Sequence, residues 1–153
     1  MVPLFARLTT LFAAAFLLIA PAEAQRAQNG VRFAYDQVPE NVDPYFNNVR
    51  IGVIIAYQVW DTLIYRDPTT NEYRGQLATA WRWVDDRTLE LDLRRGVTFH
   101  NGDPFTADDV VYTLNYVVSP DSRIITRNNV DWIARAERID DFKVRIHLAR
   151  SFP

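Results

Sequence analysis

The 153-residue sequence contains no cysteine, only two histidines, and five glycines scattered along the chain. Without cysteine, the chain can form neither a disulfide framework nor a thiol-ligated metal site. The scattered glycines form no phosphate-binding loop, and no Gly-x-Ser-x-Gly turn is present to expose a nucleophilic serine. The sequence therefore offers no catalytic constellation of these kinds, and we expect neither enzyme activity nor a cofactor.

The sequence also lacks an excess of charge of either sign. Lysine and arginine total 17, aspartate and glutamate total 19, and the formal net charge is -2. A nucleic-acid-binding domain presents a clearly basic face. We therefore expect no nucleic-acid partner.

The first 24 residues are typical of an export signal. Arg7 precedes an apolar run over residues 11–20, and the small residues Ala22 and Ala24 fit a cleavage site. The run is shorter than the ~20 apolar residues that a membrane-spanning helix needs. The alternative is a buried N-terminal core helix. We predict a signal peptide over residues 1–24 and a mature chain that begins at Gln25.

Residues 89–115 carry the clearest local pattern, and it predicts strand, turn, strand, turn and helix. Leucines at positions 89, 91 and 93 alternate with charged residues, which is typical of a strand with one dry face and one wet face. After a break at Gly96, Val97 and Phe99 resume the alternation. Residues 100–104 (HNGDP) are dense in turn formers, with Gly102 able to adopt a positive φ.

The helix expected after this turn has a marked first turn. Thr106 is a good N-cap, and Asp109 can complete a capping box with it. Phe105 and Val110 occupy the positions of a hydrophobic staple. Apolar residues then recur at helical spacing and predict one buried face; they are Val110, Val111, Leu114, Val117 and Val118.

Two similar segments predict two β-hairpins. Trp81 and Trp83 lead through residues 85–87 (DDR) into the leucine strand, and residues 139–148 repeat the pattern of residues 84–93. We expect one antiparallel sheet with a helix on one face, in a mixed α/β fold. Between the hairpins, residues 120–129 are a polar loop, and residues 130–136 fit either a short helix or the start of a strand.

The earlier part of the chain predicts shorter elements. Residues 31–35 and 63–65 have strand patterns, and residues 76–79 fit one helical turn. A helix is expected over residues 49–61, capped by Asn48 and slightly weakened by Gly52.

The loop over residues 43–48 (DPYFNN, the 43–48 loop) is the main candidate for ligand contacts. It places aromatic and amide side chains between a predicted strand and a predicted helix, where a scaffold can hold them. The candidates are Asp43, Tyr45, Phe46 and Asn47. Burial of Tyr45 and Phe46 in the core is the alternative for those two. Trp132 is a further candidate for a ligand contact, with weaker support from the same argument about loops.

A second cluster consists of His100, Asp103, Asp108 and Asp109. An imidazole and carboxylates could bind a divalent cation, so a secreted metal-dependent hydrolase is the alternative function. However, the spacing matches no zinc motif. A strand end, a turn and a helix N-terminus explain the same residues.

Several blocks of the sequence resemble the N-terminal portion of family 5 extracytoplasmic solute-binding proteins, the dipeptide-, oligopeptide- and nickel-binding class of ABC importers. The resemblance rests on residues 77–81 (LATAW), Asp86-x-Thr88 and residues 93–110 (LRRGVTFHNGDPFTADDV). Residues 42–44 and 63–65 resemble earlier landmarks of the family. The similarity extends over residues 31–153.

This resemblance implies a two-lobed fold of the type II periplasmic binding protein class, of which residues 25–153 would form the beginning of lobe one, with a small inserted subdomain. The chain would then be a fragment whose exposed apolar surface is covered by further chain. The resemblance also implies a periplasmic protein, monomeric at full length, which binds a peptide between its lobes and delivers it to ABC permease subunits in the inner membrane. Nickel, haem or a sugar is the alternative ligand. The 43–48 loop, and in some members residues 129–132, would approach the cleft.

Overall fold

The computed structural model describes residues 34–36, 38 and 41–151 of the chain. The chain divides into two compact units, residues 1–36 and 37–153. The predicted signal peptide and most of the predicted 31–35 strand lie outside the described residues, and Ala34 and Tyr35 are not in a strand. The elements in chain order are α2 (Arg50–Val59), β1 (Ile64–Arg66), β2 (Tyr73–Gly75), β3 (Ala78–Asp85), β4 (Thr88–Leu93), α3 (Ala107–Val118), η2 (Arg127–Asn129), β5 (Ile133–Asp140) and β6 (Lys143–Leu148).

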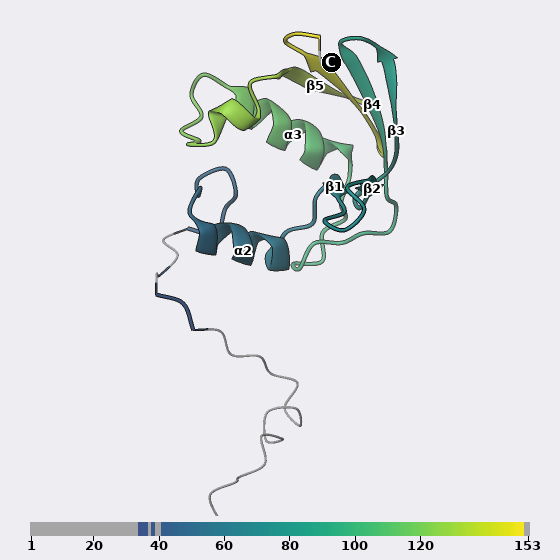
Figure 1. The fold of residues 1–153 in the computed structure, drawn as a ribbon. Helices are drawn as coiled ribbons and strands as arrows, with labels where there is room; N and C mark the ends of the chain where they lie inside the picture. Colours follow the sequence, from purple (N-terminus) through teal and green to yellow (C-terminus); the bar gives the residue numbers. More distant parts are fainter. Residues whose placement is uncertain (1–33, 37, 39–40, 152–153) are drawn as a thin grey trace, which may run out of the picture. The chain divides into compact units, whose positions relative to one another are not determined.

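The second unit is built on a four-stranded antiparallel sheet with strand order β3-β4-β6-β5 (Figure 1). It consists of the hairpins β3-β4 and β5-β6, joined through their second strands, so the two predicted hairpins of one sheet are confirmed. Leu91 of β4 lies opposite Trp81 of β3 on one side and Val144 of β6 on the other. Strands β1 and β2 form a separate two-stranded sheet.

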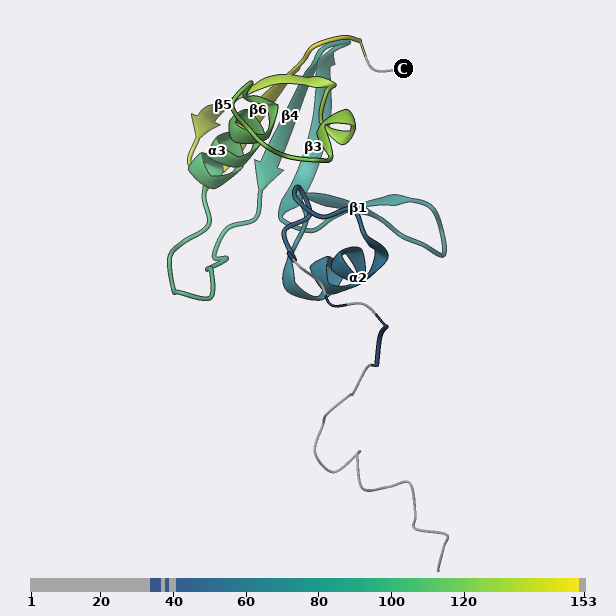
Figure 2. The same cartoon turned by 90° about the vertical axis from the view of Figure 1, so that its left-hand side faces the viewer.

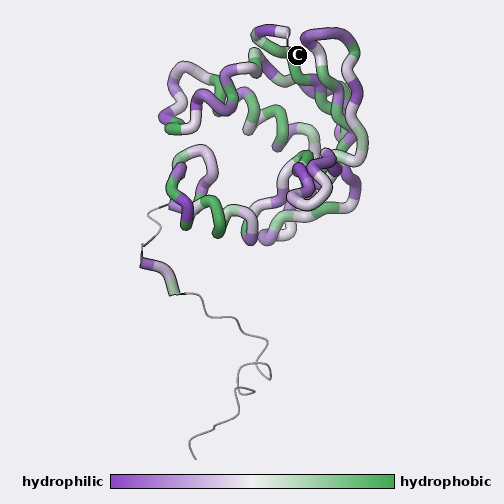
Figure 3. The backbone as a smooth tube through the Cα atoms, in the orientation of Figure 1, coloured by the Kyte–Doolittle hydropathy of each residue, from purple (hydrophilic) through white to green (hydrophobic). Residues whose placement is uncertain are grey.

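Helix α3 lies along β5 and β6 (Figures 1 and 2). Its predicted capping box is confirmed: the Thr106 hydroxyl accepts from the Asp108 N–H at 3.3 Å, and the Asp109 carboxylate accepts from the Thr106 N–H at 2.8 Å. Val110, Leu114 and Val117 of α3 are buried in one apolar cluster with the strands. Figure 3 shows α3 and the strands as alternating hydrophobic and hydrophilic stretches, as expected of elements with one buried face.

The predicted wet face of the leucine strand is wrong at Glu90. Only 5% of this residue is exposed. Strand β4 lies inside the sheet, and its neighbours place Arg82 and Arg145 opposite Glu90. The two guanidinium groups cover the carboxylate, which alternation within a single strand could not reveal.

Two further local predictions are corrected, and one open alternative is decided. The strand expected at Val97 and Phe99 reduces to one isolated bridge between Thr98 and Pro104, because the chain turns back at once through Gly102 (φ 93°). Residues 76–79 form no helical turn, since β3 already begins at Ala78. The ambiguous segment 130–136 becomes strand from residue 133 onward.

Helix α2 starts two residues after the predicted cap. Its N-cap is Val49, which has no side-chain cap, and Asn47 rather than Asn48 accepts from the Val49 N–H, at 2.9 Å. The apolar residues of α2 are largely exposed, including Ile54 and Val59. The buried residue of α2 is Gly52.

Candidate ligand-binding loop

The 43–48 loop is shaped by side chains that bond to its own backbone. The Asn41 side-chain oxygen accepts from the Asp43 N–H at 2.7 Å, and the Asp43 carboxylate accepts from the Tyr45 N–H at 2.8 Å. The Phe46 N–H closes the turn by donating to the Asp43 carbonyl at 3.1 Å. Such Asx turns are a local alternative to regular structure, so this stretch leaves the helix to begin only at residue 50.

The side-chain amide of Asn47 bonds to the backbone on both sides of the loop. Asn47 is 8% exposed, its Nδ2 donates to the Asn41 carbonyl, and its Oδ1 accepts from the Val49 N–H. Both polar atoms of this amide therefore bind the backbone on either side of the loop. A ligand contact at Asn47 stays a prediction, and the structure gives the residue an internal role as well.

Tyr45 ties the loop to a distant segment. Its carbonyl oxygen accepts from the Ile125 N–H at 3.1 Å and from the Thr126 hydroxyl at 3.2 Å. The side chains of Tyr45 and Phe46 are half-buried against the core cluster, between the two alternatives that the sequence left open. Burial, and then the charge of Asp43, raises the pKa of the Tyr45 hydroxyl above its usual value of 10.0.

A surface hollow of about 510 Å³ lies beside this loop. Its lining combines apolar and amide side chains; the residues are Val38, Asn41, Phe46, Asn47, Asn48, Val49 and Ile125. None of these lining residues carries a charge. Of the predicted site residues, Phe46 and Asn47 line the hollow, whereas Asp43, Tyr45 and Trp132 do not.

Trp132 lies further along the segment that Tyr45 contacts. Its indole N–H donates to the Asn129 carbonyl at 2.9 Å, and its ring packs partly buried against the core. Its carbonyl accepts from the Ala149 N–H at 2.8 Å. The residues after Thr126 thus connect the 43–48 loop to Trp132, although the structure does not place Trp132 in the hollow.

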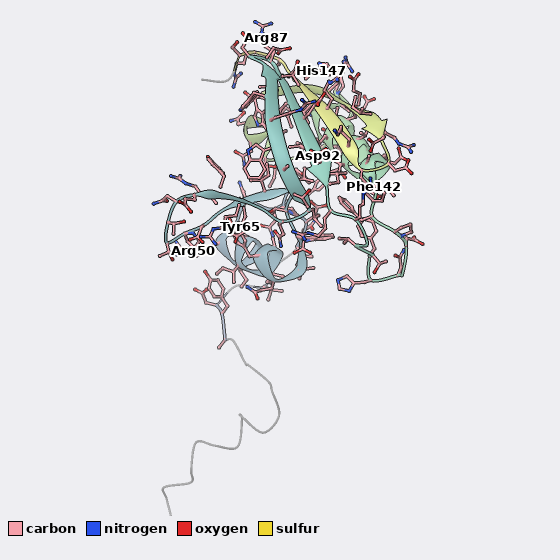
Figure 4. The ribbon with its side chains drawn as sticks, turned by 90° about the vertical axis from the view of Figure 1, so that its right-hand side faces the viewer. Arg50, Tyr65, Arg87, Asp92, Phe142 and His147 are labelled. Atoms are coloured by element: carbon pink, nitrogen blue, oxygen red, sulfur yellow. The ribbon has the colours of Figure 1, made fainter. Side chains whose placement is uncertain are left out.

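The sheet face that carries Glu90 bears a row of ion pairs across all four strands. Arg82, Glu90, Arg145 and Glu137 follow one another at matching register from β3 to β5. Arg145 bonds Glu90 at 2.6 Å and lies 3.3 Å from Glu137. The His147 Nε2 lies 3.1 Å from Glu137, without hydrogen-bond alignment. His147 of β6 and Asp92 of β4 are labelled in Figure 4.

These contacts lower the pKa of both glutamates in the row. Hydrogen bonds from Arg145 and then Arg82 lower the pKa of Glu90. A hydrogen bond from Arg135, followed by the contact with His147, lowers the pKa of Glu137 to about 2. The two carboxylates therefore stay ionised to lower pH than an ordinary glutamate, and the row consists of mutually compensated charges.

A second hollow, of about 530 Å³, lies where β4 and β5 end and β6 begins. Its lining is Thr79, Asp92, Leu93, Arg94, Arg95, Asp140, Phe142 and Lys143. Lys143 pairs with Asp92 at 3.1 Å, and the Arg95 guanidinium lies over the Phe142 ring at 4.3 Å. The Arg94 Nε donates to a backbone carbonyl at 2.7 Å. The basic groups of this hollow thus already have partners within the chain.

The residues of the alternative hydrolase site are not brought together. Asp109 caps α3, Asp108 pairs with Arg138 at 3.3 Å, and Asp103 accepts from the Asn101 amide at 2.7 Å. Among the described residues, no group of three or more histidine, cysteine, aspartate or glutamate side chains could hold a metal ion.

Within the part of the chain that the structure describes, neither helix has the length and apolar character required to cross a membrane.

The four-stranded sheet and the capped helix α3 lie in a part of the chain that matches a known protein family. The family model "Bacterial extracellular solute-binding proteins, family 5 Middle" matches residues 72–153, more than half of the sequence. The chain belongs to this family, which confirms the resemblance seen in the sequence. The fold is part of one lobe of the two-lobed periplasmic binding proteins.

Particular relatives show how much of such a protein the chain represents. It is 35% identical over 113 residues to the glutathione-binding protein GsiB of Pectobacterium atrosepticum, a match that covers 73% of this chain and 22% of that protein. The substrate-binding protein CtaP of Listeria monocytogenes is 27% identical, with a TM-score of 0.65 and coverage of 76% and 24%.

The oligopeptide-binding protein AppA of Bacillus subtilis, solved with a nonapeptide, is 23% identical; its TM-score is also 0.65, and the match covers 69% of this chain and 21% of that one. The chain spans 14% to 22% of the length of the curated relatives that it matches.

Sequence reasoning missed the role of Gly52 beside Asn47 and four residues that line the hollow: Val38, Asn41, Val49 and Ile125. Asn41 had a detectable signal, because Asn-x-Asp-x-Tyr fits two successive Asx turns. Gly52 was noted only as a weak point of a helix. Ile125 had no local signal, since it reaches the hollow from a loop about 80 residues along the chain.

Proposed function

We propose that this chain is the N-terminal part of the substrate-binding component of an ABC importer that binds peptides. The observation that carries the proposal is the 43–48 loop, which is held by its own side chains beside a hollow of apolar and amide groups. An uncharged hollow of this kind suits the apolar side chains and amide groups of a peptide. The family membership and the relative GsiB, named as a glutathione-binding protein, support this proposal.

In this proposal, the predicted site residues form one side of the ligand cleft. Phe46 supplies an apolar contact, and the amides of Asn47 and Asn48 suit polar groups of a peptide backbone. Asp43, Tyr45 and Trp132 remain candidates at the edge of this site. The remaining ligand contacts come from the other parts of the complete protein.

The proposal includes the route of the protein and its partners. Residues 1–24 direct export and are removed, residues 25–153 form the truncated binding domain, and the complete protein works as a periplasmic monomer. After closing on its peptide, it docks on permease subunits in the inner membrane. It performs no covalent chemistry.

Calorimetry and thermal unfolding of the complete gene product test this function. Glutathione, trialanine and a mixed tripeptide library are the probes. A ligand at a hundredfold excess over its Kd stabilises the folded state by about 2.7 kcal/mol. Peptide binding by the wild type should weaken in Phe46→Ala and stay unchanged in Tyr73→Ala, since Tyr73 is 68% exposed in β2.

Parallel titrations with Ni²⁺, haem and an oligosaccharide cover the alternative ligands of the family. Binding of one of these probes, with no response to any peptide, would refute the peptide assignment and leave the family membership intact.

A further inference from the structure

Gly52 and Asn47 fit against each other at the start of α2. Gly52 is buried inside the helix, although glycine is a poor residue for a helix interior. A Cβ atom added at Gly52 would overlap the Nδ2, Cγ and Oδ1 atoms of Asn47. The absence of a side chain at position 52 therefore makes room for the Asn47 amide.

The Asn47 amide bonds to two other residues that line the hollow. Its Nδ2 donates to the carbonyl of Asn41, and its Oδ1 accepts from the N–H of Val49. Asn41 and Val49 both line the hollow, as do Phe46 and Asn48 on either side of Asn47. One amide, which lies against Gly52 of the helix, thus connects two residues of the hollow's lining.

We propose that Asn47 is a positioning residue for ligand binding, and that Gly52 leaves the space in which the Asn47 amide is held. This inference rests on the proposed function of the 43–48 loop. Because Asn47 is only 8% exposed, it acts mainly by holding Phe46 and Asn48 in place. A side chain at position 52 would push the amide away from its two backbone partners rather than displace the helix, since the amide is the movable end of a side chain.

Four variants of the complete gene product test this role: Asn47→Ala, Gly52→Ala, the double variant, and Asn128→Ala as a matched control on an exposed asparagine. Calorimetry with glutathione and trialanine measures affinity, and thermal unfolding measures stability. Asn47→Ala and Gly52→Ala should each weaken binding by about tenfold, since buried hydrogen bonds of the loop are lost. Asn128→Ala should bind like the wild type.

The double variant separates positioning from a general structural effect. Alanine is the better helix former, and without the Asn47 side chain it meets no obstacle at position 52. The unfolding midpoint of the double variant should therefore rise above that of Gly52→Ala, while its affinity stays about tenfold weak. Recovery of affinity together with stability would overturn the proposal, as would wild-type affinity in either single variant.

Amide hydrogen exchange gives a readout that needs no ligand. In Gly52→Ala, exchange should accelerate at the Val49 N–H, which loses its Asn47 acceptor, while the Leu91 N–H in the sheet keeps its protection. Unchanged protection at Val49 would refute the Asn47–Gly52 contact itself. If the contact is confirmed but the wild type binds neither probe, the peptide function fails, and with it the positioning role in peptide binding.

Discussion

Replacing Asn115 by aspartate tests how the edge of the main sheet is closed. The side chain of Asn115, in α3, makes two reciprocal bonds to one residue of the edge strand β5. Its Nδ2 donates to the Ala136 carbonyl at 2.9 Å, and its Oδ1 accepts from the Ala136 N–H at 2.8 Å. The amide thus pairs with β5 as a further strand would, and attaches α3 to the sheet.

Aspartate keeps the shape and the acceptor but loses the donor. At neutral pH, its second oxygen would face the Ala136 carbonyl, so one good bond is replaced by a repulsive contact. Losing one partner of a half-buried pair costs about 1–3 kcal/mol of unfolding free energy. Asn115→Ala removes both bonds and should cost a similar amount, because the backbone groups of β5 can then reach water only in part.

Two measurements on the complete gene product test this prediction: urea unfolding gives the unfolding free energy, and hydrogen exchange reports on the Ala136 N–H. In Asn115→Ala that amide should exchange faster than in the wild type. Asn115→Asp should regain stability as the pH is lowered to where an aspartyl carboxyl protonates, because the protonated acid can donate to the Ala136 carbonyl. Unchanged stability and unchanged exchange in both variants would refute the idea that the amide closes the sheet edge.

Three other outcomes follow from the fold. Thr106→Ala should lower the unfolding free energy by about 1 kcal/mol through loss of the N-cap, with Thr106→Ser close to the wild type in the same urea titration. Leu91→Ala should cost about 2–5 kcal/mol, because only 2% of that residue is exposed, and Val84→Ala at an exposed position should cost far less. The pKa of Glu137 is lowered from 4.5 to about 2, so its contribution to stability is present above pH 4.5 and lost as the pH falls through 2. Glu137→Gln should therefore flatten the decline of thermal stability between pH 4.5 and 2, and an unchanged acid profile would contradict the role of its arginine contact.

The local signals of the sequence predicted much of the second unit. The capping box at Thr106, the turn at Gly102 and both hairpins are confirmed, because each depends on residues that are close in sequence. The same local logic failed where a residue's environment came from elsewhere. Glu90 looked like a solvent-facing residue until the neighbouring strands placed an arginine on each side of it.

In the candidate site, too, some features depend on residues close in sequence and others on contacts with distant segments. The sequence by itself located the 43–48 loop, since its turn formers and aromatic residues are adjacent, and its long matching blocks were enough to recognise the family. Only the tertiary structure showed that Tyr45 is bonded to residues 125 and 126, and that Gly52 makes room for Asn47. Composition and periodicity report on neighbours along the chain, whereas the shape of a binding surface depends on contacts between segments that folding brings together.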